Sequence, residues 1–157
     1  MEQHAELRCE EACLCSQIML DLYGCKSDYL DDLEWVENVL IEAANCGGAF
    51  IIDVVFHKLK PSGIVGVIII ADAHLTVRTW PEYRYAAVEI FTAGKAFDCD
   101  AAVAQLAIRF RCAKRSLTTI ERGKAAELAE YAGAAAIATA AADRGEAMHF
   151  RKFPFQF

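Results

Sequence analysis

The chain has 157 residues, a mass of 17.3 kDa and a formal net charge of −6. This length predicts one domain, and a hydrophobic fraction of 55% excludes a disordered or collagen-like chain. The acidic balance argues against a duplex nucleic-acid binder, which is usually basic. The longest apolar run, residues 64–71, is far shorter than the ~20 residues of a membrane helix. The start of the chain is acidic where a signal peptide is basic. We therefore expect a cytoplasmic protein with no nucleic-acid or membrane partner.

Seven cysteines, an odd number at irregular spacings, predict free thiols rather than a secreted disulfide framework. Cys9, Cys13 and Cys15 lie close together, and with His4 they offer four metal-binding side chains. Their spacing is not a common zinc spacing, however, so no metal site is predicted.

The first third of the chain predicts an arm, a strand and a helix. Residues 1–15 are expected to form an N-terminal arm, and residues 17–23 a strand that ends at Gly24. Asp31 and Glu34 are spaced as a capping box, with Asp31 as the N-cap. Apolar residues then recur at helical spacing at Leu33, Val36, Val39, Leu40 and Ala43. Two glycines at 47 and 48 end this helix.

The middle of the chain changes to a strand pattern rich in Val, Ile, Thr and aromatic residues. Four strands are predicted, at residues 50–57, 64–71, 74–80 and 85–92. The turns between them lie at residues 61–63, 72–73 and 81–82, where Pro, Gly and Asp favour turns.

The last third predicts an amphipathic helix over residues 98–111, a strand over 115–121 and an alanine-rich helix over 124–142. The final residues, 150–157, include four phenylalanines that we expect to pack on this domain or on a partner. The order of elements predicts a layered α+β domain with a mostly antiparallel sheet.

One stretch of the chain carries a family resemblance. Residues 71–83 read ADAHLTVRTWPEY, and they are preceded by FHKL at 56–59 and PSGIVGVI at 61–68. They are followed by YAA at 85–87 and FTAG at 91–94. This pattern resembles the small prokaryotic S-adenosylmethionine decarboxylases of polyamine (spermidine) biosynthesis. The resemblance covers roughly residues 18–123, and we assign the decarboxylase-like domain to residues 16–123, with the arm at 1–15 and the extension at 124–157 outside it.

The resemblance implies a two-layer α/β sandwich that dimerises and cuts its own chain. In such proteins a serine hydroxyl attacks the carbonyl of the preceding glutamate, and the downstream chain is left with a pyruvoyl group. The ketone of that group forms a Schiff base with the substrate amine and accepts electrons as CO2 leaves.

The sequence departs from this family at the cleavage site. The Glu-Ser-His triplet of the family is Asp72-Ala73-His74 here. Ala73 has no hydroxyl, so no ester forms, and we expect the pyruvoyl cofactor to be absent.

Other positions that the resemblance assigns to the active site are also changed. Arg78 replaces the histidine that assists processing, and an arginine does not exchange its proton near neutral pH. Ala93 replaces a cysteine proton donor, and Val65 replaces a serine between two glycines. Leu59 replaces an aromatic residue that stacks on adenine.

Four residues remain as ligand-binding candidates: Leu59, His74, Trp80 and Glu82. In the family the glutamate lies near the substrate ribose. Each also has a purely structural interpretation, as a core or interface aromatic, a hydrogen-bonded histidine or a salt-bridged carboxylate. We further expect Asp53 or Glu89 to pair with Arg78 or Arg84, because arginine and carboxylate recognise each other well.

Several coordinated losses predict a natural, non-processing homologue rather than a single trapping mutation. Such a protein would act as a regulatory or structural partner, as a homodimer or as a heterodimer with an active paralogue. The alternatives are a binding module for a nucleoside or polyamine, an active decarboxylase whose serine has been replaced by Ala73, and an enzyme with new chemistry.

Overall fold

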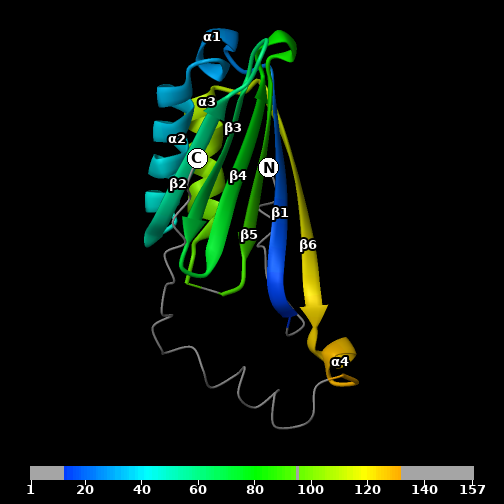
Figure 1. Cartoon of the computed structure of the whole chain (residues 1–157). Coiled ribbons are helices and arrows are strands. Elements are labelled where there is room, and N and C mark those ends of the chain that lie inside the picture. Colours follow the sequence, from blue (N-terminus) through cyan, green and yellow to red (C-terminus); the bar gives the residue numbers. More distant parts are fainter. Residues whose placement is uncertain (1–12, 95, 132–157) are drawn as a thin grey trace.

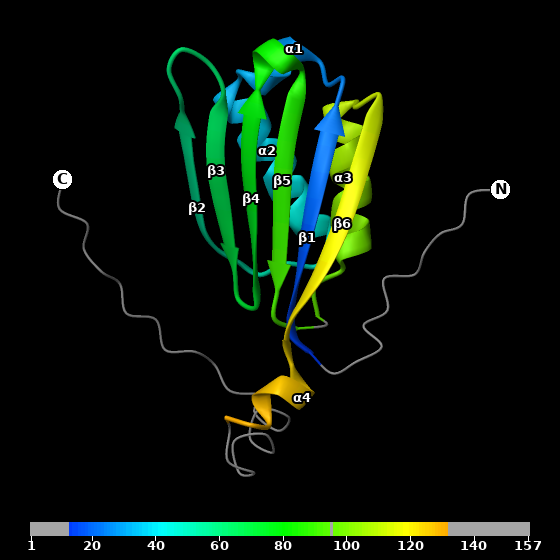
Figure 2. The same cartoon turned by 90° about the vertical axis from the view of Figure 1, so that its right-hand side faces the viewer.

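A computed structural model of the chain describes residues 13–94 and 96–131. Its centre is a six-stranded sheet in the order β2-β3-β4-β5-β1-β6, in which every neighbouring pair is antiparallel (Figure 2). The strands are β1 (Cys13–Tyr23), β2 (Ile51–Lys58), β3 (Ile64–Ile70), β4 (Ala73–Trp80), β5 (Tyr85–Thr92) and β6 (Lys114–Lys124).

Two helices, α2 (Leu33–Cys46) and α3 (Cys99–Phe110), cover one face of this sheet (Figure 1). The shorter helices are α1 (Ser27–Leu30), η1 (Pro81–Tyr83) and α4 (Ala125–Leu128). The predicted α+β, two-layer sandwich with an antiparallel sheet is therefore confirmed.

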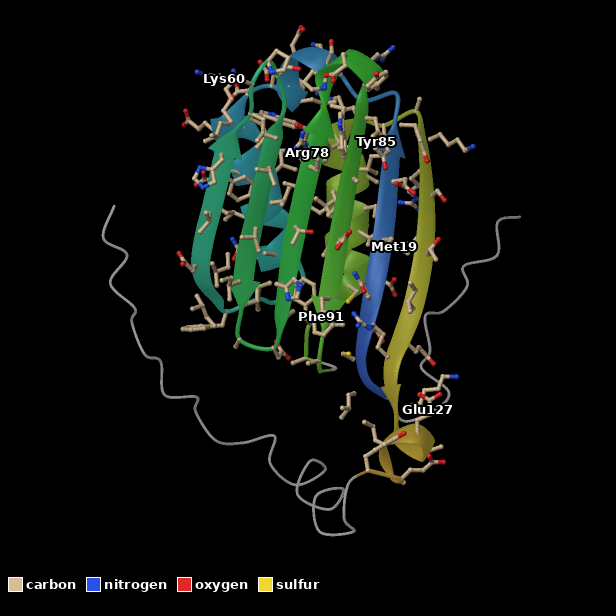
Figure 3. The ribbon with its side chains drawn as sticks, turned by 45° about the vertical axis from the view of Figure 1, so that its right-hand side comes forward. Met19, Lys60, Arg78, Tyr85, Phe91 and Glu127 are labelled. Atoms are coloured by element: carbon tan, nitrogen blue, oxygen red, sulfur yellow. The ribbon has the colours of Figure 1, made fainter. Side chains whose placement is uncertain are left out.

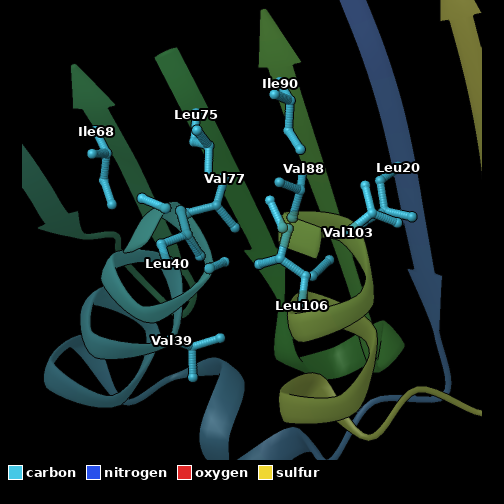
Figure 4. Packing of buried hydrophobic residues seen from close by; sticks show 14 of the residues in the cluster. Leu20, Val39, Leu40, Ile68, Leu75, Val77, Val88, Ile90, Val103 and Leu106 are labelled. Carbon is cyan, nitrogen blue, oxygen red and sulfur yellow. The ribbon is translucent and has the colours of Figure 1, made fainter. Parts of the chain in front are cut away.

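The core lies between the sheet and the two long helices. Alternate residues of β1, β4 and β5, such as Leu20, Leu75 and Val88, point toward the helices and are at most 1% exposed. Leu40 of α2 and Leu106 of α3 meet them from the other layer (Figure 4). Burying side chains of this size contributes ~1.5–3 kcal/mol each, which holds the helices on this one face.

The N-cap of α2 is Asp32, whose carboxylate accepts a hydrogen bond from the Trp35 N–H at 3.1 Å. The prediction that Asp31 caps this helix is wrong. Asp31 instead accepts a hydrogen bond from the Gly63 N–H at 2.8 Å and pairs with Lys58 at 3.0 Å. Its carboxylate is therefore engaged by residues distant in sequence and does not cap the helix.

Other predicted boundaries differ at the ends of the chain. Strand β1 begins at Cys13, inside the predicted arm, because residues 13–16 pair with β6. The alanine-rich helix is helical at Ala125–Leu128 and becomes a turn at 129–131. The rest of that helix, the aromatic tail at 150–157, His4 and Cys9 lie outside the described residues.

Over residues 13–94 and 96–131, no helix combines the length and the apolar character needed to cross a membrane.

Candidate functional site

The sheet has a second face, opposite the helices, which we call the open face (Figure 3). Because strand side chains alternate, the residues between the core positions project from it. The pairing register arranges them in rows that cross the strands: Trp80–Tyr85–Tyr23–Lys114, His57–Val65–Arg78–Ala87–Asp21–Ser116, Val55–Val67–Thr76–Glu89–Met19–Thr118 and Ile69–His74–Phe91–Gln17–Ile120, with Asp53 beside Ile69.

Two of the substituted family positions meet on the open face. Val65 of β3 lies directly opposite Arg78 of β4. The Arg78 guanidinium lies over the ring of Trp80, with its central carbon 5.2 Å from the ring centroid. Its Nε is buried and has no hydrogen-bond partner within the described residues. The position thus holds a fixed positive charge beside an apolar neighbour, and neither group can transfer a proton.

An aromatic row crosses the open face next to Arg78. The rings of Trp80 and Tyr85 lie 5.3 Å apart, and those of Tyr85 and Tyr23 lie 5.2 Å apart. The Tyr85 hydroxyl donates a hydrogen bond to the Asp21 carboxylate. Burial, and then this carboxylate, raise the pKa of Tyr85 well above its usual value. Tyr85 is therefore a neutral donor at physiological pH.

The cleavage triplet lies at the turn between β3 and β4, at the other end of the sheet. Ala73 begins β4, is 6% exposed and faces the helix layer, where its methyl joins the core. The carbonyl of Asp72 accepts a hydrogen bond from the Ala93 N–H at 2.8 Å. The structure thus brings Asp72, Ala73 and Ala93 together. Ala73 itself lies five residues, about 16 Å, along β4 from Arg78.

The predicted ligand-binding residues are not gathered at one point. His74 stacks on Phe91 of the open face, with ring centroids 4.9 Å apart. Leu59 lies in the β2–β3 loop, where its N–H donates to the Gly63 carbonyl at 2.8 Å. Only Trp80 lies beside Arg78.

The fourth ligand-binding candidate, Glu82, lies in η1 at the same end of the sheet as Leu59. Its carboxylate accepts a hydrogen bond from the Ser62 hydroxyl at 3.1 Å. The two candidates therefore belong to one cluster of loops, held together by Asp31, Ser62 and Gly63.

The predicted arginine–carboxylate pairs are wrong. Arg84 donates to the backbone carbonyls of Cys25 and Gly24 at 3.0 and 3.2 Å. The Glu89 carboxylate accepts instead from the Gln17 side chain, and that of Asp53 from the Val54 N–H. Arg84 also has a φ of +51°, a left-handed conformation that side chains disfavour, so its position is held by these backbone contacts.

Cys99, beside the cleavage turn, is a poor nucleophile. Burial raises the pKa of its thiol to about 11, and the carboxylates of Asp100, Asp98 and Asp72 add to the effect. In the part of the chain that the structure describes, no three histidine, cysteine or acidic side chains are grouped to hold a metal ion.

Comparison with known proteins identifies the family. The family model of S-adenosylmethionine decarboxylase matches residues 16–123. The S-adenosylmethionine decarboxylase proenzyme of Pseudomonas aeruginosa strain LESB58 is 41% identical over 107 residues, which are 68% of this chain and 67% of that protein. The chain belongs to the S-adenosylmethionine decarboxylase family. The proenzyme of Thermodesulfovibrio yellowstonii is also 41% identical, over 69% of this chain and 80% of its own length.

The fold agrees with this assignment. The crystal structure of the adenosylmethionine decarboxylase from Aquifex aeolicus VF5 superposes with a TM-score of 0.66 and 27% sequence identity. The match covers 71% of this chain and 92% of the Aquifex chain. The residues that the family model matches, 16–123, include both long helices and nearly the whole sheet.

Sequence reasoning missed two features at or near the open face. Tyr23 belongs to the aromatic row, and Asp21 beside it accepts the Tyr85 hydrogen bond. The alternation of β1 places both on the face opposite the core residues Leu20 and Leu22. That alternation could have identified them. Arg84 was named only as a partner for a carboxylate, and nothing in the sequence around it marks its positive φ.

Proposed function

We propose that this chain is a family member of polyamine biosynthesis that neither cuts itself nor forms a pyruvoyl group. It serves instead as a regulatory or structural partner. The observation that carries the proposal is Ala73: its methyl group is packed in the core and supplies no nucleophile. The nearby groups do not replace it, because Ala93 is inert and the Cys99 thiol is protonated at neutral pH.

The open face supports the same proposal. Processing in the family needs a histidine, and Arg78 offers only a permanent positive charge there. Val65, directly opposite, has no hydroxyl with which to assist. A serine restored at position 73 would still lack a proton-transfer partner, because Ala93 beside it is inert and Arg78 lies about 16 Å away along β4.

Intact mass spectrometry of the reduced protein tests this proposal. We expect one species near 17.3 kDa and no labelling by a carbonyl-reactive hydrazide. The variant Ala73→Ser should also stay uncut. The triple variant Ala73→Ser/Val65→Ser/Arg78→His, which restores the family residues at all three positions, is its matched comparison for cleavage. Two fragments from the unaltered chain, or rapid and complete cleavage of Ala73→Ser alone, would overturn the proposal.

As for partners, we propose a homodimer, or a heterodimer with an active paralogue, formed through the open face. Val65, Ile69 and Ile120 on this face are 36–41% exposed, which is costly for apolar side chains in a monomer. Arg78 of β4 and the carboxylate of Glu89 on β5 give the face both charge signs. A second copy, related by a twofold axis, would be self-complementary.

Sedimentation of the full chain tests the homodimer. Ile69→Glu should shift it toward the monomer. Ile108→Glu is the matched control, because Ile108 is 68% exposed on α3, away from the open face. Removing residues 150–157 should shift the assembly or lower its stability if the four phenylalanines seal the interface. A monomer in every case contradicts the homodimer and favours a tail that covers the vacated face.

A second candidate function is a nucleoside-binding module, which the row of Trp80, Tyr85 and Tyr23 favours because bases stack on aromatic rings. A polyamine is less suitable, since Arg78 already lies over Trp80 and repels a second cation. Quenching of tryptophan fluorescence by adenosine but not by spermidine would support this candidate. No quenching by either would exclude it.

A further inference from the structure

Away from the open face, the end of β1 lies close to the segment that follows α3. The β1–β6 register closes on the pair Tyr23–Lys114. The two segments stay together past it, because the Ala113 N–H donates to the Tyr23 carbonyl at 2.8 Å. A Cβ built on Gly24 would lie only 2.8 Å from the Cβ of Ala113, so these two residues face each other.

Cysteines occupy the next position on each segment. Cys25 follows Gly24 and Cys112 precedes Ala113, so the two cysteines flank this close contact. Cys25 is fully buried in the core cluster, and Cys112 is partly exposed and packs against the same cluster, so both side chains turn to the same side. A disulfide needs Cα atoms about 4.4–6.8 Å apart, a separation open to residues that flank so close a contact.

We propose that Cys25 and Cys112 form a reversible disulfide, a modification site that joins the end of β1 to the end of α3. The electron acceptor is a low-molecular-weight disulfide such as glutathione disulfide. The thiolate of Cys112, the accessible partner, attacks it, giving a mixed disulfide and releasing one glutathione thiolate. The thiolate of Cys25 then attacks the Cys112 sulfur and releases the second. Two protein thiols thus lose two protons and two electrons, and one glutathione disulfide becomes two glutathiones.

The surroundings make the two steps unequal. Burial, and then the neighbouring Cys112, raise the pKa of Cys25 to about 11, while the positive charge of Arg84 opposes this rise. At neutral pH little Cys25 is thiolate, so ring closure is the slow step. In the reduced protein each thiol also donates to a carbonyl, Cys25 to Leu22 and Cys112 to Ala107, and closure gives up both contacts.

The site is linked to the loops that hold Glu82. The Cys25 N–H donates to the Arg84 carbonyl at 2.9 Å, and the Arg84 guanidinium donates back to the Cys25 carbonyl. Arg84 directly follows η1. A disulfide at Cys25 would therefore restrain the segment that holds Arg84, and with it η1.

Mass spectrometry of the full chain in glutathione redox buffers tests the proposal. Oxidation should lower the mass of the protein by about 2 Da, after passing through a glutathione adduct on Cys112. Conversion of that adduct should accelerate about tenfold for each pH unit between 7 and 9, because the Cys25 thiolate fraction rises tenfold per unit.

Trypsin cuts after lysine and arginine, so the unreduced digest should contain peptide 112–114 joined to peptide 9–26. The second peptide carries other cysteines, so variants assign the partner. Cys25→Ala and, independently, Cys112→Ser should abolish the link, whereas Cys13→Ser and Cys15→Ser should retain it. Cys46→Ser is the control for an exposed thiol elsewhere. A link that survives Cys25→Ala, an intermolecular disulfide only, or no mass loss in excess glutathione disulfide would overturn the proposal.

Discussion

Removing the hydroxyl of Thr79 should destabilise the protein far more than its size suggests. Thr79 is 1% exposed on β4, and its Oγ makes two hydrogen bonds between different elements. It accepts from the Ile64 N–H of β3 at 2.8 Å and donates to the Leu30 carbonyl of α1 at 2.7 Å. One side chain thus joins a helix and two strands below the loops that hold Glu82.

The magnitude follows from what Thr79→Val leaves behind. Valine has almost the same shape, so the packing is kept, but one N–H and one carbonyl lose their partners in the interior. Each such group costs ~1–3 kcal/mol, and partial relaxation reduces the sum to about 2–4 kcal/mol. With a urea dependence of ~1–3 kcal/mol per molar for a protein of this size, the midpoint should fall by about 1–2 M.

Urea unfolding followed by circular dichroism measures this shift. Thr79→Ser is the matched control, because it keeps the hydroxyl and loses only a methyl group, at a cost of about 1 kcal/mol. If Thr79→Val unfolded at the same urea concentration as Thr79→Ser, the two hydrogen bonds would not stabilise the fold as argued.

Two further substitutions test local features. Arg84→Ala should cost about 1–2 kcal/mol, because it keeps the left-handed φ of +51° and loses the bonds to the Gly24 and Cys25 carbonyls. Arg84→Gly relieves the strain of the left-handed backbone, so this variant should melt at a higher temperature than Arg84→Ala. The reverse order would contradict the claim that the backbone is strained at this position. The Gly63 N–H, and then Lys58, hold the pKa of the Asp31 carboxyl below its usual range. The ionised Asp31 therefore stabilises the fold at neutral pH, and this stabilisation is lost as the pH falls through the lowered pKa. Asp31→Asn should therefore cost about 1 kcal/mol or less at pH 7, since solvent partly screens this half-exposed carboxylate. The difference in urea midpoint between the two proteins should narrow below about pH 4. A difference in urea midpoint that does not change with pH would show that the charge of Asp31 does not stabilise the fold.

Much of the fold was predictable because the apolar periods are clear. The strand over residues 85–92 and the helix over 98–111 agree with β5 and α3 to within one residue at each end. Local signals failed where a distant contact decides the outcome. In the sequence Glu34 favours Asp31 over Asp32 as the cap, and only the approach of Gly63 assigns Asp31 to another role.

The candidate site was predictable in its residues but not in its layout. The family pattern identified Ala73 and Arg78, yet their positions on opposite faces of β4 follow from strand alternation and register. The roles of Asp21 and Tyr23 of β1 were not predicted, since β1 joins β5 only through pairing across more than 60 residues of chain. Sequence spacing alone does not specify which strand will lie beside which.

Strand β6 closes one edge of the sheet, and its exposed side chains have a consequence for how copies of this protein meet. A long strand with an unpaired edge is a template for adding another strand, which leads to uncontrolled fibrous growth. Here that edge carries Lys114, Arg115, Arg122 and Lys124, with Glu121 as its one acidic residue. Two such strands approaching each other would bring like charges face to face. The repulsion discourages stacking along this edge and so favours the open face for the homodimer proposed above.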